Sequence, residues 1–317
     1  MSNVIQIENV SKRFGKTIAM DNVSLSVPAG CVFAVWGENG AGKTTAIRSI
    51  LGLQKPDQGK IEVLGRDPLK KGVELRREIG YVPDSPTLYP WMKVEEIGWF
   101  TSGFYAKGYQ GSFEALCQQF ELPLDRKIKQ LSKGGKAKVG LALAMAHQPE
   151  LLILDEPTSG LDTLVRRKFL ECMVDVAAEG RTVLLSSHQI PEVERVADWV
   201  AIVNEGRVMV CERLDELKQQ LERWVISFDG DEKQVPEFVG EILTHEGQGA
   251  RRQQLVVRNP DANALWQLRD HPAIAEVEVH TPSLEEIFVA YMQADLSSQS
   301  STQPSSPTKL DQEVNNG

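Results

Sequence analysis

The sequence predicts an α/β protein with a buried parallel sheet, followed by a smaller α+β domain. Continuously apolar segments of strand length occur at 31–36 (CVFAVW), 151–154 (LLIL) and 182–185 (TVLL), as expected of strands buried on both faces of a sheet. Helical hydrophobic periods lie between core strands, at 136–147 and 164–178. In the last third of the chain, shorter strands and helices alternate again.

Length and composition are those of a globular chain with room for one large domain and a small one. The 317 residues are 41% hydrophobic and 25% charged, with a formal net charge of −9. This acidic balance argues against a protein that coats nucleic acid through a basic surface, so we expect no nucleic-acid partner. No signal peptide is expected, and no apolar run approaches the roughly 18 residues that a membrane span needs. A membrane function would therefore require another chain.

Two β-strands are predicted at an antiparallel edge of the core. Residues 3–10 alternate apolar and polar side chains, which indicates an edge strand, and residues 21–27 alternate in the same way before a turn. The stretch 81–149 has a mostly helical pattern and separates two core strands, so we predict a helical subdomain at about 84–150. Several of its aromatic side chains are expected to be exposed: Tyr89, Trp91, Trp99 and Phe100.

The remaining elements complete the large domain, 1–221, and build the small one, 222–293. A hairpin is predicted at 198–211, with NEG as its turn, and a helix over 213–223. In the small domain, strands are expected at 224–228, 254–258 and 275–279, and helices near 238–243, 262–270 and 283–292. The tail, 294–317, has almost no apolar residues and is expected to be disordered.

A phosphate-binding loop is predicted at 37–45, where GENGAGKTT matches the pattern GxxxxGK[ST] between a buried strand and a helical run. Its backbone N–H groups and the helix N-terminus would surround phosphate oxygens. Lys43 would reach the β- and γ-phosphates, and Thr44 would offer a hydroxyl to Mg²⁺. The alternative is a glycine-rich turn without a ligand. The expected nucleotide-binding residues are Gly37, Asn39, Gly40, Ala41, Gly42, Lys43, Thr44 and Thr45.

Two adjacent carboxylates, Asp155 and Glu156, follow the strand LLIL. The carboxyl end of a strand in a parallel sheet is where ligands bind, beside the phosphate-binding loop. Asp155 is placed to hold Mg²⁺ through water, and Glu156 to act as base toward a water that attacks the γ-phosphate. The alternative is a strand that merely ends in an acidic loop.

The segments GENGAGKTT, LSKGG, LLILDEPTSGLD and LLSSH, in this order and spacing, resemble those of ABC transporter ATP-binding subunits over residues 1 to about 220. The resemblance implies an ABC-type P-loop ATPase domain with ATP and Mg²⁺ as cofactors. It implies that Phe14 stacks on adenine, or alternatively packs against its own turn. It implies that His188 contacts the γ-phosphate, and that Asp162 lies in a loop crossing to a second subunit. Lys43, Glu156 and His188 are the expected catalytic residues.

Two positions depart from the family pattern. Asp84 stands where a glutamine usually links Mg²⁺ and the attacking water to the helical subdomain; the alternative is a simple turn residue. Lys133 replaces the first glycine of the family motif LSGGQ. In the family, the serine and the backbone of this motif grip the ATP of the partner subunit. Ser132 and Gly134 are retained. Lys133 weakens the site if the backbone needs positive φ there, and otherwise adds positive charge near phosphate. We expect a modified but working site.

The leading functional hypothesis is the ATPase subunit of a transporter, dimerising with itself or a paralogue to sandwich two ATP. It would lie in the cytoplasm, on the inner face of the membrane, bound to integral membrane permease subunits. The segment TPSLEEIFVAYM, 281–292, resembles the C-terminal segment of prokaryotic ABC-2-type exporter ATPases. The alternative is a soluble ABC ATPase acting on DNA or the ribosome. Family members with those roles carry long coiled-coil insertions with heptad patterns, or two ATPase domains in one chain. The sequence shows neither feature, which argues against this alternative. A non-catalytic regulatory subunit is disfavoured because Lys43, Glu156 and His188 are present.

Overall fold

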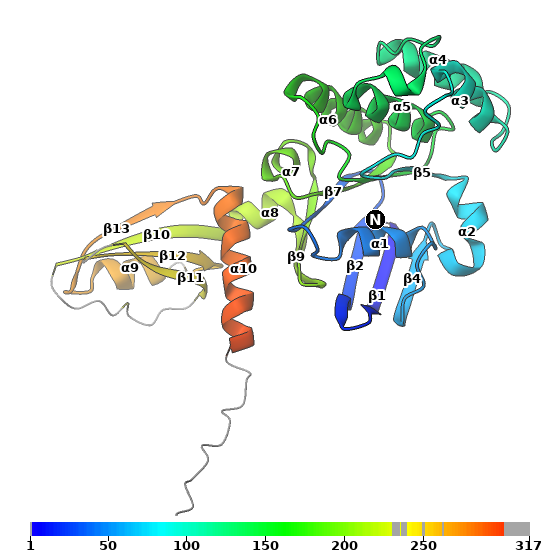
Figure 1. The fold of residues 1–317 in the computed structure, drawn as a ribbon. Coiled ribbons are helices and arrows are strands. Elements are labelled where there is room, and N and C mark those ends of the chain that lie inside the picture. Colours follow the sequence, from blue (N-terminus) through cyan, green and yellow to red (C-terminus); the bar gives the residue numbers. More distant parts are fainter. Residues whose placement is uncertain (1, 230–234, 236–239, 249–250, 262, 301–317) are drawn as a thin grey trace, which may run out of the picture. The chain divides into compact units, whose positions relative to one another are not determined.

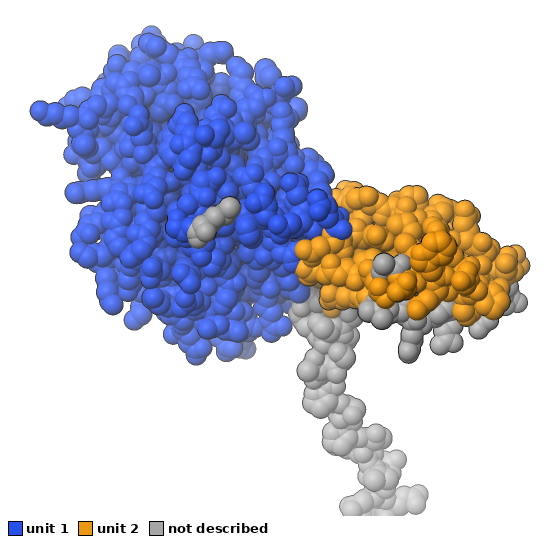
Figure 2. All heavy atoms as spheres, turned by 180° about the vertical axis from the view of Figure 1, so that it is seen from behind, with its two compact units in different colours: residues 1–219 blue, residues 220–317 orange. Residues whose placement is uncertain are grey.

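The computed structural model describes residues 2–229, 235, 240–248, 251–261 and 263–300. They belong to two compact units, residues 1–219 (unit 1) and 220–317 (unit 2), coloured separately in Figure 2. Each unit has a hydrophobic core of its own. The division falls close to residue 221, where the sequence predicts the end of the large domain.

A six-stranded sheet forms the centre of unit 1, in the order β5-β6-β7-β3-β8-β9. All its neighbouring strands run parallel except β9, which pairs antiparallel with β8. Every residue of β3, β6 and β7 is buried, which confirms the prediction from their apolar runs. The strands are β3 (Val32–Trp36), β5 (Ile79–Val82), β6 (Leu151–Asp155), β7 (Thr182–Ser187), β8 (Trp199–Asn204) and β9 (Arg207–Arg213).

A separate three-stranded antiparallel sheet lies beside helix α1 (Lys43–Ile50) in unit 1. Strand β1 (Asn3–Phe14) pairs with both β2 (Thr17–Pro28) and β4 (Gln58–Val63). The prediction of an edge strand at 3–10 is therefore wrong. Alternation reveals one buried face, but it does not reveal whether one or both hydrogen-bonding edges are occupied.

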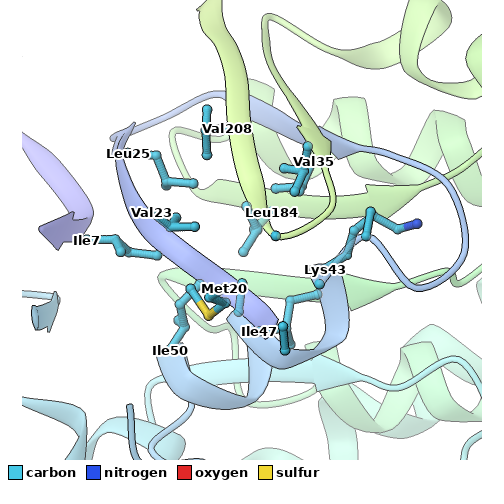
Figure 3. A pocket seen from close by; sticks show the side chains of 16 residues that line it. Ile7, Met20, Val23, Leu25, Val35, Lys43, Ile47, Ile50, Leu184 and Val208 are labelled. Atoms are coloured by element: carbon cyan, nitrogen blue, oxygen red, sulfur yellow. The ribbon is translucent and has the colours of Figure 1, made fainter. Parts of the chain in front are cut away.

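Apolar side chains cover both faces of the six-stranded sheet. One core joins it to α1 and the three-stranded sheet, and Figure 3 shows Ile47 and Ile50 of α1 near Met20 and Val23 of β2. In the same view the Lys43 amine points away from this apolar pocket. The other face packs against α5 (Lys133–Met145) and α6 (Thr163–Ala178). Because successive strand residues face opposite sides, Ile153 joins the first core and Leu152 the second.

Helices α3 (Val94–Ser102), α4 (Tyr109–Gln119) and α5 cluster at one end of unit 1 around their own core (Figure 1). This is the region predicted to be a helical subdomain. Tyr89, Trp91, Trp99 and Phe100 are exposed, as expected. Unit 1 also contains the short 3₁₀ helix η1 (Ile128–Gln130) and the helices α2 (Pro68–Arg76), α7 (Ile190–Val196) and α8 (Leu214–Gln219).

Unit 2 has an antiparallel sheet in the order β11-β12-β10-β13, packed around the buried Trp224. Its strands are β10 (Leu221–Phe228), β11 (Glu241–Gln248), β12 (Arg252–Arg258) and β13 (Ile274–His280). Its helices are α9 (Ala264–Arg269) and α10 (Leu284–Ser300).

Three sequence predictions in and near unit 2 need correction. The helix predicted over 213–223 ends at Gln219, because β10 pairs from Leu221 onward. Residues 241–243, predicted as part of a helix, belong to β11, where pairing with β12 overrides their local pattern; residues 238–239 lie outside the described part. Helix α10 continues to Ser300, so 294–300 is not a disordered tail, since no glycine or proline interrupts it; 301–317 lies outside the described residues.

Candidate functional site

The loop between β3 and α1 is the predicted phosphate-binding loop. Gly42 has a φ of 104°, and a Cβ there would lie 2.2 Å from the carbonyl oxygen of Ala19. Any side chain would clash with backbone, so glycine is required both for conformation and for space. The helix begins at the next residue, Lys43, and its free N-terminal N–H groups therefore face the loop.

One pocket gathers most of the predicted nucleotide-binding residues. Phe14 at the end of β1 is 49% exposed there, so its ring is free to stack on a flat base. Lys12 Nζ lies 5.4 Å from the centre of that ring. The residues that line the pocket are Phe14, Thr17, Ala19, Glu38, Asn39, Gly40, Ala41, Gly42, Lys43, Thr44, Thr45, Asp84 and Glu156. Thr17, Ala19 and Glu38 were not predicted, although Thr17 and Ala19 follow Phe14 closely and Glu38 lies inside the loop motif.

The three predicted catalytic side chains contact one another in series, with Glu156 between Lys43 and His188. Lys43 is buried, and its Nζ donates to the carbonyl oxygens of Gly37 (2.6 Å) and Glu38 (3.1 Å). The same ammonium lies 3.0 Å from Glu156 Oε1, and Glu156 Oε2 lies 2.7 Å from His188 Nδ1. Two basic groups thus hold one poorly exposed carboxylate in place, which offsets the loss of its hydration.

The backbone at Glu156 is unusual. Its φ is 48°, a left-handed value that residues with a side chain seldom adopt. Its N–H donates to the carbonyl oxygen of Ser186 (3.2 Å) and to Ser186 Oγ (3.0 Å). Such conformations cluster at functional sites, where the surrounding structure maintains them. Here β7 fixes the carboxylate at the end of β6.

The predicted Mg²⁺-binding oxygens lie side by side. Asp155 is buried, and its Oδ1 accepts hydrogen bonds from Thr44 Oγ1 (3.2 Å) and Ser186 Oγ (2.6 Å). Asp84, which follows β5, lines the same pocket. Hydroxyl and carboxylate oxygens are the ligands that Mg²⁺ prefers, so these side chains fit that ion.

The segment LSKGG begins α5, away from the residues that line this pocket. Ser132 is the N-cap of α5, and its Oγ accepts from the Gly135 N–H at 3.1 Å. Lys133 is the first helical residue and has no positive φ, so the possibility that it strains the backbone is excluded. A Cβ on Gly134 would lie 3.3 Å from Val165 Cγ1, which leaves little room for a larger residue. Asp162 caps α6, accepting from the Val165 N–H at 3.0 Å.

Comparison with known proteins points to one family. Residues 20–159 match the family model described as ABC transporter. Over 298 residues the chain is 30% identical to the uncharacterised ABC transporter ATP-binding protein YhaQ of Bacillus subtilis, covering 90% of this chain and 97% of the relative. It is 31% identical over 293 residues to the Nod factor export ATP-binding protein I of Sinorhizobium fredii, covering 90% and 84%.

A solved structure agrees with this result. The dimeric structure of MJ0796, a bacterial ABC transporter cassette, is similar with a TM-score of 0.60 and 26% identity, covering 66% of this chain and 98% of that one. Together with the phosphate-binding loop and its carboxylates, these likenesses leave one assignment. The chain belongs to the ABC transporter family, in which it is an ATP-binding and ATP-hydrolysing subunit.

Proposed function

We propose that two such chains sandwich two ATP molecules and use their hydrolysis to drive separate membrane subunits of an exporter. The observation that carries the proposal is that Glu156 contacts both Lys43 of the phosphate-binding loop and His188. In it Glu156 accepts a proton from the attacking water, and Lys43 and His188 bind phosphate oxygens. Thr44 and Asp155, with Asp84 in the same pocket, would hold Mg²⁺, which would supply neutralisation of phosphate charge.

The placement of LSKGG, 131–135, which we call the signature segment, supports a dimer. Ser132, Gly134 and Asp162 lie outside the residues that line the chain's own pocket. Ser132 Oγ and the N-terminus of α5 present the kind of donors that bind phosphate. A second copy or a paralogue would bring its own ATP against them. The cassette to which this chain is similar is dimeric, which supports the proposal of a dimer.

A groove beside the helical subdomain supports the proposal of a permease partner. Tyr105 and His147 stack there at 4.4 Å, and burial lowers the pKa of His147 despite an opposing backbone hydrogen bond at Ile79, so this imidazole is uncharged at neutral pH. Exposed aromatic rings nearby in sequence are in mutual contact, including Tyr89 with Trp91 at 5.2 Å. Such surfaces suit an apolar partner. Most other lining residues are apolar, among them Leu53, Leu88 and Leu143, and Arg76 is the charged one.

The partner must supply the membrane path. Among the described residues, no helix combines the length and apolar character that crossing a bilayer requires. We place the protein at the inner face of the membrane, attached through its permease. Export is the proposed direction, because a relative aligned over most of this chain is a Nod factor export protein. The alternative, an ATPase acting on DNA or the ribosome, is not favoured because these relatives are transporter proteins.

Substitution of the proposed base tests this function. Glu156→Gln keeps the shape of the side chain but removes the proton acceptor, so it should retain ATP binding, lose nearly all hydrolysis and accumulate an ATP-bound dimer. Glu179→Gln, at an exposed surface carboxylate, is the matched control and should behave like the parent. Hydrolysis by the Glu156→Gln protein near the parental rate would overturn the assignment. Fractionation adds a second test, because co-sedimentation with ribosomes rather than permease-containing membranes would favour the alternative.

A further inference from the structure

Three charged side chains are buried among the described residues: Lys43, Asp155 and Glu192. Lys43 lines the ATP pocket, and Asp155 accepts a hydrogen bond from Thr44, which also lines it. Glu192 is 2% exposed and lies on α7, just after His188 in the sequence. The roles described above do not use it. Because an isolated carboxylate is expensive to bury, its partners indicate what it does.

Each oxygen of Glu192 holds a different segment of unit 1. Thr158 Oγ1 donates to Glu192 Oε1 at 2.5 Å, and Ser187 Oγ donates to Glu192 Oε2 at 2.8 Å. Arg166 Nε lies 3.5 Å from Oε1 and supplies the compensating charge. Ser187 Oγ in turn accepts from the Gln189 N–H at 3.0 Å. The carboxylate is therefore fully engaged, and loss of one partner would leave part of it buried and unsatisfied.

One of these segments borders the chain's own ATP pocket. Ser187 directly precedes His188, whose ring contacts Glu156. A movement of His188 would displace its neighbour Ser187. That displacement would change the hydrogen bond between Ser187 Oγ and Glu192 Oε2. One hydrogen bond and one peptide bond thus connect Glu192 to His188, the proposed ligand of the γ-phosphate.

The other segment is the loop that the proposed dimer would place against a second subunit. Thr158 begins the loop that ends at Asp162, the N-cap of α6. Arg166 Nη2 donates to the carbonyl oxygen of Leu161 at 3.3 Å, so the charge partner of Glu192 also holds the far end of this loop. Both ends of the loop thus depend on one carboxylate.

The loop also contacts the start of α5. Val165 packs against Gly134, and the ammonium of Lys133 occupies the space that a Cβ on Gly160 would need. The elements offered to a partner's ATP, namely the loop and the segment around Ser132, therefore form one packed group. Glu192 connects that group to His188.

We propose that Glu192 is a positioning residue that couples a chain's own ATP pocket to the loop and signature segment it presents to the partner's ATP. The proposal rests on the dimer of the proposed function. Occupancy of one pocket moves His188, and the shared carboxylate passes that movement to Thr158 and Asp162. A carboxylate that only anchored α7 would need no link to both segments.

A double-mutant cycle in mixed dimers tests the coupling. Two differently tagged chains are paired, one intact and measured for hydrolysis, the other carrying Lys43→Ala, Glu192→Gln, both or neither. Lys43→Ala disables the second chain's pocket and should slow the intact site by about tenfold when Glu192 is present. In the Glu192→Gln chain the same substitution should change the rate by less than about twofold, because the connection is already cut.

Single-bond variants and a control sharpen the result. Thr158→Val and Ser187→Ala each remove one of the two hydrogen bonds and should reproduce the lost coupling if Glu192→Gln fails to fold. Glu194→Gln, on the same helix and paired with Lys218 at the surface, should leave the coupling intact. ATP affinity of the isolated chains should be unchanged in all four single substitutions outside the pocket.

An equal slowing by Lys43→Ala with and without Glu192→Gln would overturn the proposal, since an anchor of α7 predicts additive effects. Failure of the Glu156→Gln chains to dimerise with ATP would overturn the proposed function, and this coupling with it. A dimer that forms but shows additive effects would leave the proposed function standing and remove only the role of Glu192.

Discussion

Units 1 and 2 bury their polar groups in different ways. In unit 1, Lys43 at the start of α1, Asp155 at the end of β6 and Glu192 in α7 are buried. Glu156 has a left-handed backbone next to Asp155. Among the described residues of unit 2, no charged side chain is buried to this degree, and its sheet closes around an apolar core that contains Trp224. Burying charge lowers stability unless it is compensated, so a region that does so repeatedly is organised for chemistry. We therefore assign ATP chemistry to unit 1 alone.

The largest effect on activity expected in this comparison is at Lys43. Lys43→Ala removes a charge-assisted partner of phosphate and should weaken ATP binding by about 100-fold, equivalent to about 2.7 kcal/mol, and abolish hydrolysis. Isothermal titration of the purified chain measures it. Lys60→Ala, at an exposed lysine paired with Glu62, is the control. Unchanged affinity in the Lys43→Ala protein would contradict the assigned pocket.

A large effect is also expected in unit 2, but on stability rather than on binding. Trp224 is fully buried in the core, so Trp224→Ala should destabilise unit 2 by about 3–5 kcal/mol. ATP affinity should stay within about twofold of the parent, because the described residues that line the ATP pocket belong to unit 1. Thermal unfolding followed with and without ATP separates the two outcomes. Loss of ATP binding together with unfolding of unit 2 would show that the units are not independent.

The smallest effect concerns a surface ion pair of unit 2. Burial disfavours ionisation of Glu286, but hydrogen bonds from Ser283 and Arg223 outweigh it and hold the pKa of this carboxyl below its usual value. A depressed pKa in the folded state stabilises the protein above the unfolded pKa of about 4.3, and that contribution disappears as pH falls through the folded value. Glu286→Gln should therefore lower the free energy of unfolding at pH 7 by less than about 1 kcal/mol, and the melting temperature slightly.

Melting at pH 7 and pH 3 provides the check for Glu286. The difference between parent and Glu286→Gln should shrink at the lower pH, because protonation of the Glu286 carboxyl removes the charge that the glutamine lacks. Unit 1 should melt identically in both proteins. A difference that grows on acidification would contradict the sign of the pKa shift.

The two units also differ in how well the sequence predicted them. Strands β3, β6 and β7 were predictable because short, continuous apolar runs are typical of strands buried on both faces, and the loop at 37–45 because its glycines are required by backbone geometry. In unit 2, β11 was expected to be partly helical, since its short segment gains strand structure from pairing with β12 rather than from its own pattern.

Part of the site could not be predicted from spacing. Glu192 lies 34 residues after Thr158 in the sequence, and a glutamate in a polar helix gives no sign that it is buried. The contacts of Glu156 with Lys43 and His188 were easier to anticipate. Parallel strands end at the same edge of a sheet and bring such residues together. Hydrogen bonds between side chains from distant loops became visible only in the fold.

The most direct measurement is ATP binding by a chain that ends after Gln219. All residues that line the pocket, and the segments proposed to act on a partner, lie before that point. We predict that this folded fragment binds ATP within about twofold of the full chain, and that with Glu156→Gln it still forms an ATP-dependent dimer. A fragment that folds but no longer binds ATP would contradict the assignment of ATP chemistry to unit 1 alone.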